Sequence, residues 1–145
     1  MMKIEHSVVI ERPIEEVFAF LNDAENNPTW QSGVLEAEKT SEGDIEKGTT
    51  YREVRKFLGQ RIESTYEITE HEPNKKLASK TISGPIPVTL TTTFESVEGG
   101  TKVTVVGEAD PGGFFKLAEA VVSRTFAKSL DADFGSLKAI MEAEA

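Results

Sequence analysis

The strongest candidates for chemistry in this sequence lie on one predicted strand, over residues 49–58, and are Tyr51, Glu53, Arg55 and Phe57. Side chains of a strand alternate between its two faces, so these four residues share one face. If the aromatic side chains point inward, the acid and the base do so as well. Such a pair could neutralise itself through a hydrogen-bonded bridge, orient a polar group of a ligand, or assist proton transfer.

The opposite assignment of this strand places Val54 and Leu58 inside and leaves both charges in solvent. We favour the inward assignment, because two exposed aromatic side chains would be the more unusual outcome. Burying a single charge is expensive. An inward acid and base should therefore lie close enough to each other, or to His6 or Tyr66, to be paired.

The two histidines, His6 and His71, are the side chains whose ordinary pKa lies near neutral pH. His6 shares a predicted strand face with Ile4 and Val8. It is interpreted either as a general base or hydrogen-bond donor to a bound carbonyl, or, more commonly for such a residue, as a core histidine satisfied by its neighbours. His71 precedes a predicted turn at Pro73, where we expect it in solvent.

The sequence offers little that could hold a metal or a cofactor. The chain has no cysteine, and Pro73 interrupts any zinc-binding helix that could start at His71. It has neither a Walker lysine nor a dinucleotide-binding glycine pattern, and no nucleophile motif accompanies the histidines. We therefore expect no metal, no cofactor and no catalytic triad.

Hydroxyl groups are scattered over the predicted inward strand faces, at Ser64, Tyr66, Ser79, Thr81 and Thr92. Threonines in strands usually reflect the β-propensity of that residue type. Small polar groups in an apolar cavity are also the groups that orient a ligand. Both interpretations are open for each of these residues.

The elements that position these side chains follow from the periodicity of the chain. Residues 2–11 alternate between apolar and polar types, which predicts a half-buried strand. Pro13 suits the first turn of a short helix with an apolar stripe over residues 17–21, and a second short turn leads toward Trp30. From residue 33 to residue 110 the period is two, with turn residues between the runs, which predicts six further strands.

The last part of the chain changes to a helical period. Its apolar residues recur at steps of three and four and predict one long amphipathic helix. They are Phe115, Ala118, Val122, Phe126, Leu130, Phe134, Leu137 and Met141. We expect the first four to face the sheet and part of this stripe to line, with Tyr51, Tyr66 and Leu90, a pocket of roughly 300 Å³ or more.

These elements predict an α+β fold in which a curved, antiparallel, seven-stranded sheet wraps around a long C-terminal helix, with two short helices after the first strand. A length of 145 residues predicts a single domain over residues 1–145. Trp30 is expected to be structural, packed where the short helices lead into the second strand. Buried indoles usually find a partner, so its indole nitrogen should be hydrogen-bonded.

The charge balance argues against several classes of partner. Lysine and arginine total 16 against 25 acidic residues, for a net charge of −9, whereas nucleic-acid binding normally needs a basic surface. No apolar run approaches the roughly 20 residues that span a membrane, and no targeting signal is visible. The absence of cysteine fits a reducing compartment. We expect a soluble, cytoplasmic protein, and the oligomeric state is left open.

Short motifs run through nearly the whole chain in a consistent order. They are Glu11-Arg12-Pro13 followed by Val17-Phe18, then Asp23, Trp30, Gly48-Thr49-Thr50, Glu67-Ile68-Thr69-Glu70, Glu72-Pro73, Leu77-Ala78, Phe94-Glu95, Gly99-Gly100-Thr101-Lys102-Val103 and Leu137-Lys138. Together with the predicted elements, they resemble the START-like, or helix-grip, superfamily (SRPBCC), in its polyketide cyclase/dehydrase-like branch. The motifs are mostly structural, and they are specific for the fold rather than for a function.

The resemblance implies a cavity for a small, largely apolar molecule, since function in such folds resides in the cavity lining. One hypothesis is a binding protein or carrier for a lipid, a polyketide-like compound or an aromatic metabolite. The alternative is a cyclase- or dehydrase-type enzyme, which needs a positioned acid or base such as Glu53, Arg55, His6 or Tyr66. A third, a module that binds partner proteins, would need an apolar outer patch. The candidate ligand-binding residues are Tyr51, Glu53, Arg55, Phe57, Tyr66, Leu90, Thr92, Phe115, Val122 and Phe126.

Overall fold

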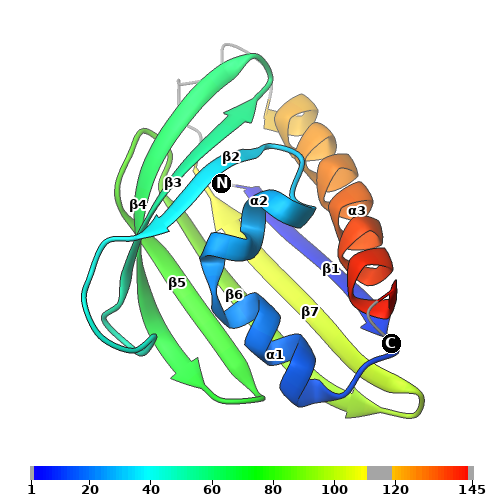
Figure 1. Cartoon of the computed structure of the whole chain (residues 1–145). Coiled ribbons are helices and arrows are strands. Elements are labelled where there is room, and N and C mark those ends of the chain that lie inside the picture. Colours follow the sequence, from blue (N-terminus) through cyan, green and yellow to red (C-terminus); the bar gives the residue numbers. More distant parts are fainter. Residues whose placement is uncertain (1, 111–118, 144–145) are drawn as a thin grey trace.

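A single antiparallel sheet of seven strands curls around one long helix in the computed structural model, which describes residues 2–110 and 119–143 (Figure 1). The strand order is β1-β7-β6-β5-β4-β3-β2, so the first strand pairs with the last, and of the connections between these seven described strands only that from β1 to β2 crosses the sheet. The strands are β1 (Met2–Ile10), β2 (Val34–Lys39), β3 (Thr50–Phe57), β4 (Gln60–Glu72), β5 (Lys76–Ser83), β6 (Val88–Val97) and β7 (Gly100–Ala109).

The crossing connection consists of the short helices α1 (Ile14–Asn22), η1 (Ala24–Asn26) and α2 (Asn27–Trp30). Pro13 stands directly before α1, where its missing N–H costs no hydrogen bond. Asp23 ends α1, and its carboxylate accepts a hydrogen bond of 3.0 Å from the backbone N–H of Glu25, which caps η1. The predicted α+β architecture with short helices after the first strand is confirmed.

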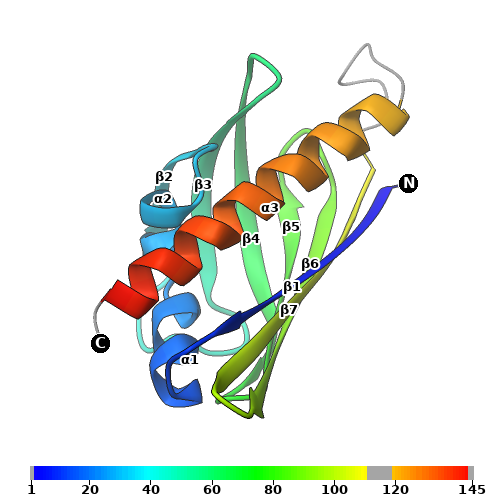
Figure 2. The ribbon, with the colours of Figure 1, turned by 90° about the vertical axis from the view of Figure 1, so that its right-hand side faces the viewer.

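Helix α3 (Glu119–Ala143) crosses the concave face of the sheet (Figure 2). Its second half packs into the larger of two buried clusters, through Phe134, Leu137 and Met141. From the other side this cluster receives Val17 and Phe18 of α1, Ile10 of β1, Phe94 of β6, and Val103 and Val105 of β7. A smaller cluster of Ile62, Ile86 and Val122 lies at the first half of the helix.

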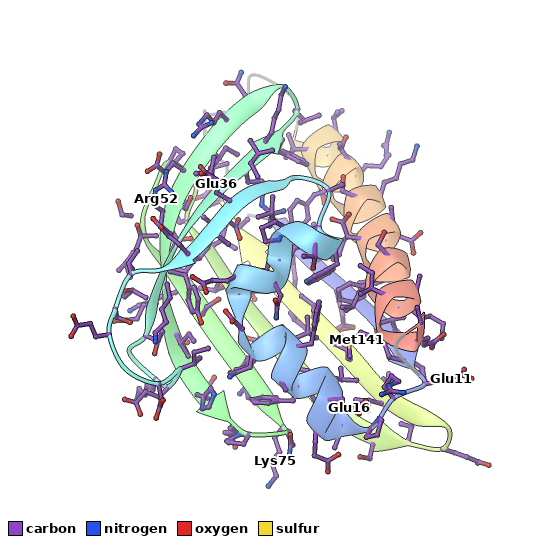
Figure 3. The ribbon with its side chains drawn as sticks, viewed as in Figure 1. Glu11, Glu16, Glu36, Arg52, Lys75 and Met141 are labelled. Carbon is purple, nitrogen blue, oxygen red and sulfur yellow. The ribbon has the colours of Figure 1, made fainter. Side chains whose placement is uncertain are left out.

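The C-terminal turn of α3 is tied to the end of β1. The Glu142 carboxylate accepts a hydrogen bond of 2.9 Å from the backbone N–H of Glu11, and the Lys138 ammonium donates one of 2.9 Å to the carbonyl of Val9. Lys138 and Glu142 also pair at 2.6 Å. Hydrogen bonds from Lys138 and from Glu11 lower the pKa of Glu142. Figure 3 labels Glu11 and Met141 at this junction.

The outer face of β3 carries a separate set of charges. Arg52 contacts Glu63 across the strand pair at 2.9 Å and also approaches Glu38 at 3.5 Å. A third carboxylate, that of Glu36, lies 3.9 Å from Arg52, and Figure 3 labels the Arg52 and Glu36 side chains.

Within the described ranges 2–110 and 119–143, no helix has the length and apolar character needed to cross a membrane.

One predicted position is wrong. His71 does not lie in solvent beside a turn, because β4 continues to Glu72 and carries the histidine against α1. The ring is half-buried, its Nε2 atom lies 2.9 Å from Asn22 Oδ1, and it meets the ring of Phe18 edge-on at 5.8 Å. Since Asn22 lies 49 positions earlier in the chain, the contact is tertiary and the local turn signal could not reveal it.

Candidate functional site

A cavity of about 260 Å³ lies between the sheet and helix α3. Its walls are mainly apolar and come from all seven described strands, from the short helices, and from residues 122–134 of α3. It is smaller than the expected minimum of roughly 300 Å³. Its lining includes the aromatic side chains of Trp30, Tyr51, Phe57, Tyr66, Phe126 and Phe134.

The structure brings the candidate residues together wherever it describes them. Phe115 and Ala118 lie outside the described residues. The candidates that line the cavity are Tyr51, Glu53, Arg55, Phe57, Tyr66, Leu90, Thr92, Val122 and Phe126. A contact of these side chains with a ligand stays a prediction.

Glu53 and Arg55 both face the cavity, as alternation along β3 predicts. Arg55 Nε donates a hydrogen bond of 3.0 Å to Glu53 Oε1, and Arg55 Nη2 donates one of 2.7 Å to Gln31 Oε1. The exposed fraction of the side chain is 10% for Glu53 and 22% for Arg55. Val54, on the other face of the strand, is also buried. Burial in β3 is therefore not confined to one face.

Tyr66 adds a hydroxyl to this pair from the neighbouring strand. Its Oη atom lies 3.4 Å from Glu53 Oε1, and burial, followed by the negative charge of Glu53, raises the pKa of Tyr66. Burial acts to lower the pKa of Arg55, but Glu53 and Tyr66 outweigh this effect and raise it above its ordinary value. Arg55 is therefore a permanent positive charge, and Tyr66 holds its proton throughout the physiological range.

Asp133 of α3 is a second buried acid in the cavity wall, and it is not among the residues predicted from the sequence. It is 5% exposed, and its Oδ1 atom accepts hydrogen bonds from Ser32, of 3.1 Å from the backbone N–H and 3.0 Å from Oγ. Its spacing from Leu130 and Leu137 places it on the apolar stripe of the helix. An acid inside such a stripe is the signal that could have identified it.

Trp30 packs at the corner between α2 and the sheet, as expected, but its predicted hydrogen bond is absent. The side chain is 7% exposed, and its ring lies 5.7 Å from that of Phe134. Among residues 2–110 and 119–143, Nε1 has no hydrogen-bond partner. The indole forms part of the cavity wall, where no protein acceptor reaches it.

Tyr51 shares this property. It is 4% exposed, it lines the cavity, and its hydroxyl finds no acceptor in the part of the chain that the structure describes. Burial, followed by the charge of Asp23, raises the pKa of Tyr51 to about 12. The nearby backbone amide of Ala24 offsets part of this rise, and Glu25 adds to it. The hydroxyl therefore stays protonated.

His6 lies elsewhere. Its Nε2 atom is 3.6 Å from Asp131 Oδ1 of α3, and its ring meets that of Phe134 edge-on at 4.9 Å. It is absent from the described lining of the cavity. Of the candidate acids and bases, the structure thus gathers Glu53, Arg55 and Tyr66 at one place and separates the histidine from them.

The sequence pattern of the family described as polyketide cyclase/dehydrase and lipid transport matches residues 1–142. None of the curated proteins compared with the chain matches its sequence.

Solved structures of similar fold cover nearly the whole chain. A START superfamily protein from Mycobacterium smegmatis is 11% identical, with a TM-score of 0.84 and 99% of each chain covered. TTHA0849 from Thermus thermophilus is 17% identical, with a TM-score of 0.85 and the same coverage. The di-domain ARO/CYC protein BexL, from the BE-7585A biosynthetic pathway, is 20% identical with a TM-score of 0.69. The match covers 95% of this chain and 45% of BexL. At these identities the likeness concerns the fold.

Proposed function

The chain belongs to the polyketide cyclase/dehydrase and lipid transport family, and we propose that it binds a small, largely apolar molecule in the cavity between the sheet and helix α3. The observation that supports this proposal is the cavity itself, about 260 Å³ with mainly apolar walls and a few convergent polar groups. Apolar concave sites with a small number of placed polar groups are typical of small-molecule binding sites.

The cavity-lining candidates then divide into two roles. Apolar contact area comes from Phe57, Leu90, Val122 and Phe126. The polar candidates orient the ligand by hydrogen bonds, and they are Tyr51, Glu53, Arg55, Tyr66 and Thr92.

Two measurements test the binding proposal. Native mass spectrometry of the gently purified protein should show a retained small molecule, or the protein should bind the uncharged fluorescent probe N-phenyl-1-naphthylamine. Val122→Phe should reduce probe binding, because Val122 is 1% exposed and lines the cavity. The matched control is Val121→Phe, at the neighbouring position, which is 42% exposed.

Both variants should first be shown to fold, since overpacking a core position costs about 1–3 kcal/mol. Equal probe binding by the two variants would place the probe outside the cavity. A protein that retains no molecule and binds no probe would contradict the proposal.

The second candidate function is a cyclase- or dehydrase-type enzyme, which the buried cluster of Glu53, Arg55 and Tyr66 favours. A fixed positive charge in a cavity can stabilise the oxygen of a developing enolate, and a carboxylate beside it can accept a proton. Incubation with a β-diketone of polyketide type, followed by mass spectrometry, tests for turnover. An enzyme should lose turnover in Glu53→Gln, which removes the carboxylate that accepts the proton, but should still bind N-phenyl-1-naphthylamine. A carrier should return the compound unchanged from wild type as well.

A further inference from the structure

Two buried donor groups in the cavity wall lack an acceptor. Trp30 Nε1 and the Tyr51 hydroxyl belong to residues that are 7% and 4% exposed, and within residues 2–110 and 119–143 neither group finds an acceptor. The backbone N–H of Ala24 acts on the Tyr51 oxygen as a donor, which leaves the proton of the hydroxyl without a partner. Both residues line the same cavity. Buried polar atoms in folded proteins are nearly always paired, and an unpaired one is costly. These two positions therefore favour a ligand that supplies the hydrogen-bond acceptors that the protein lacks there.

The chemistry of the two groups defines what that ligand must offer. An indole N–H is a donor and cannot accept a hydrogen bond. The Tyr51 hydroxyl holds its proton far into the alkaline range. Both groups therefore require an acceptor, and oxygen is the common acceptor in small apolar metabolites. A pure hydrocarbon would leave both donors buried and unpaired.

The charges of the cavity limit the kind of oxygen that fits. In the described part its charged lining residues are two buried acids, Glu53 and Asp133, the exposed acid Glu108 and one base, Arg55, so acids outnumber bases. The Arg55 guanidinium already pairs with Glu53 at 3.0 Å. Two further carboxylates, of Asp23 and Glu25, lie close enough to Tyr51 to disfavour a negative charge there. A carboxylate ligand would meet this excess of negative charge between mainly apolar walls.

We propose that the cavity selects an uncharged molecule that carries carbonyl oxygen, accepting hydrogen bonds from Trp30 Nε1–H and the Tyr51 hydroxyl, and that it rejects carboxylates of the same shape. The proposal rests on the binding function proposed above and narrows its ligand class. It gives Trp30, expected from the sequence to be purely structural, a role in ligand selection.

Three compounds of matched shape test the selection. They are 2-acetylnaphthalene, with one carbonyl oxygen; 2-isopropenylnaphthalene, in which carbon replaces that oxygen; and 2-naphthoate, which carries a negative charge. We expect the ketone to bind about tenfold more tightly than either of the others, the difference that one or two satisfied hydrogen bonds supply. The affinities are measured by NMR titration of the isotope-labelled protein.

The single tryptophan of the chain makes the contact directly visible. Its indole N–H gives one cross-peak, which should move downfield with the ketone and stay nearly in place with the hydrocarbon. In Trp30→Phe and in Tyr51→Phe the preference for the ketone over the hydrocarbon should fall severalfold. The control is Thr93→Val, which removes an exposed hydroxyl of β6 outside the described lining and should keep the preference.

If Trp30→Phe fails to fold, the indole cross-peak of wild type and the Tyr51→Phe variant still decide the question. Equal binding of ketone and hydrocarbon with an unmoved indole cross-peak would overturn the selection while leaving the binding function intact. Tighter binding of naphthoate would overturn the charge argument and the proposal with it. Failure of all three compounds to bind would overturn the proposed function and this inference together.

Discussion

The ion pair between Glu53 and Arg55 can be tested by replacing each residue with methionine, singly and together. Methionine keeps a long, flexible side chain in place, so the change removes charge with little loss of volume. The structure predicts that the two residues are energetically coupled, because Arg55 Nε donates a 3.0 Å hydrogen bond to a carboxylate that is 8% exposed. The four proteins form a double-mutant cycle.

The expected magnitudes follow from what each change leaves behind. Arg55→Met leaves the buried Glu53 carboxylate with the Tyr66 hydroxyl, at 3.4 Å. Removing one partner of a buried pair costs about 3–5 kcal/mol. We expect about 3 kcal/mol, the lower end, because 22% of the Arg55 side chain is accessible.

Glu53→Met leaves Arg55 with its 2.7 Å hydrogen bond to Gln31, so we expect a smaller loss of about 2 kcal/mol. The double variant buries no unpaired charge. Its loss should be smaller than the sum of the two single losses by about 2 kcal/mol.

The assay is chemical denaturation of the four proteins at neutral pH. The matched control is the Arg52–Glu63 pair on the outer face of the same strands, which has a similar hydrogen bond of 2.9 Å but a 56% exposed carboxylate. Exposed pairs couple weakly, so a second cycle on this pair should give a coupling near the error of the measurement.

A coupling energy between Glu53 and Arg55 below about 0.5 kcal/mol would refute the reasoning, since sites that do not interact can depart from additivity by that much. A coupling energy for this pair that is no larger than the one measured for Arg52 and Glu63 would also refute it. In either case the pair would not be held together by burial, and the polar cluster would lose its place in the proposed site.

Three further predictions concern pH and packing. Burial, as the leading cause, raises the pKa of Tyr51 and Tyr66, so neither phenol should ionise near 10, their ordinary value, in an absorbance titration of the folded protein. Stability should fall above that pH because the unfolded chain loses these protons first, and a folded-state transition at pH 10 would contradict this. Glu142→Gln should lower Tm slightly at neutral pH. Because the pKa of Glu142 is lowered in the folded protein, its carboxylate stabilises the fold above the ordinary pKa of 4.5, and this stabilisation is lost as acid protonates the carboxylate. A Tm difference between wild type and Glu142→Gln that persists in strong acid would contradict this prediction. Gly100→Ala should cost about 3 kcal/mol or more in denaturation, because a Cβ there collides with the last carbonyl of β1. Gly99→Ala, which meets open space at a φ of 86°, should cost about 1 kcal/mol, and equal losses would contradict the collision.

Local periodicity was sufficient to predict the strands, the long helix and the cavity-facing side of β3. The alternation of Tyr51, Glu53, Arg55 and Phe57 was enough to assign an acid and a base to the inward face. It could not have excluded the other face by burial alone, because Val54 is buried as well. The inward assignment was the correct one, and the reason for it was that the other assignment would have left two aromatic residues exposed.

Partners distant in the chain were beyond this reasoning. Gln31 reaches Arg55 from the end of α2, and Asp133 reaches Ser32 from α3, 101 positions later. Neither contact follows from a period, because each depends on how the helix crosses the curled sheet. The missing hydrogen bond of Trp30 has the same origin. Whether an acceptor lies beside an indole is decided by the elements that pack around it.

The unequal clusters along α3 bear on how fast a bound molecule could enter and leave. The half with Phe134, Leu137 and Met141 joins the larger cluster, whereas the half with Val122 joins the smaller one. Regions with fewer buried contacts open more often than the whole domain unfolds. We expect the first half of the helix to separate from the sheet while the second half stays packed against it. The residence time of a ligand would then depend on this local opening, and a mutation at Leu137 should lower global stability without releasing the ligand faster.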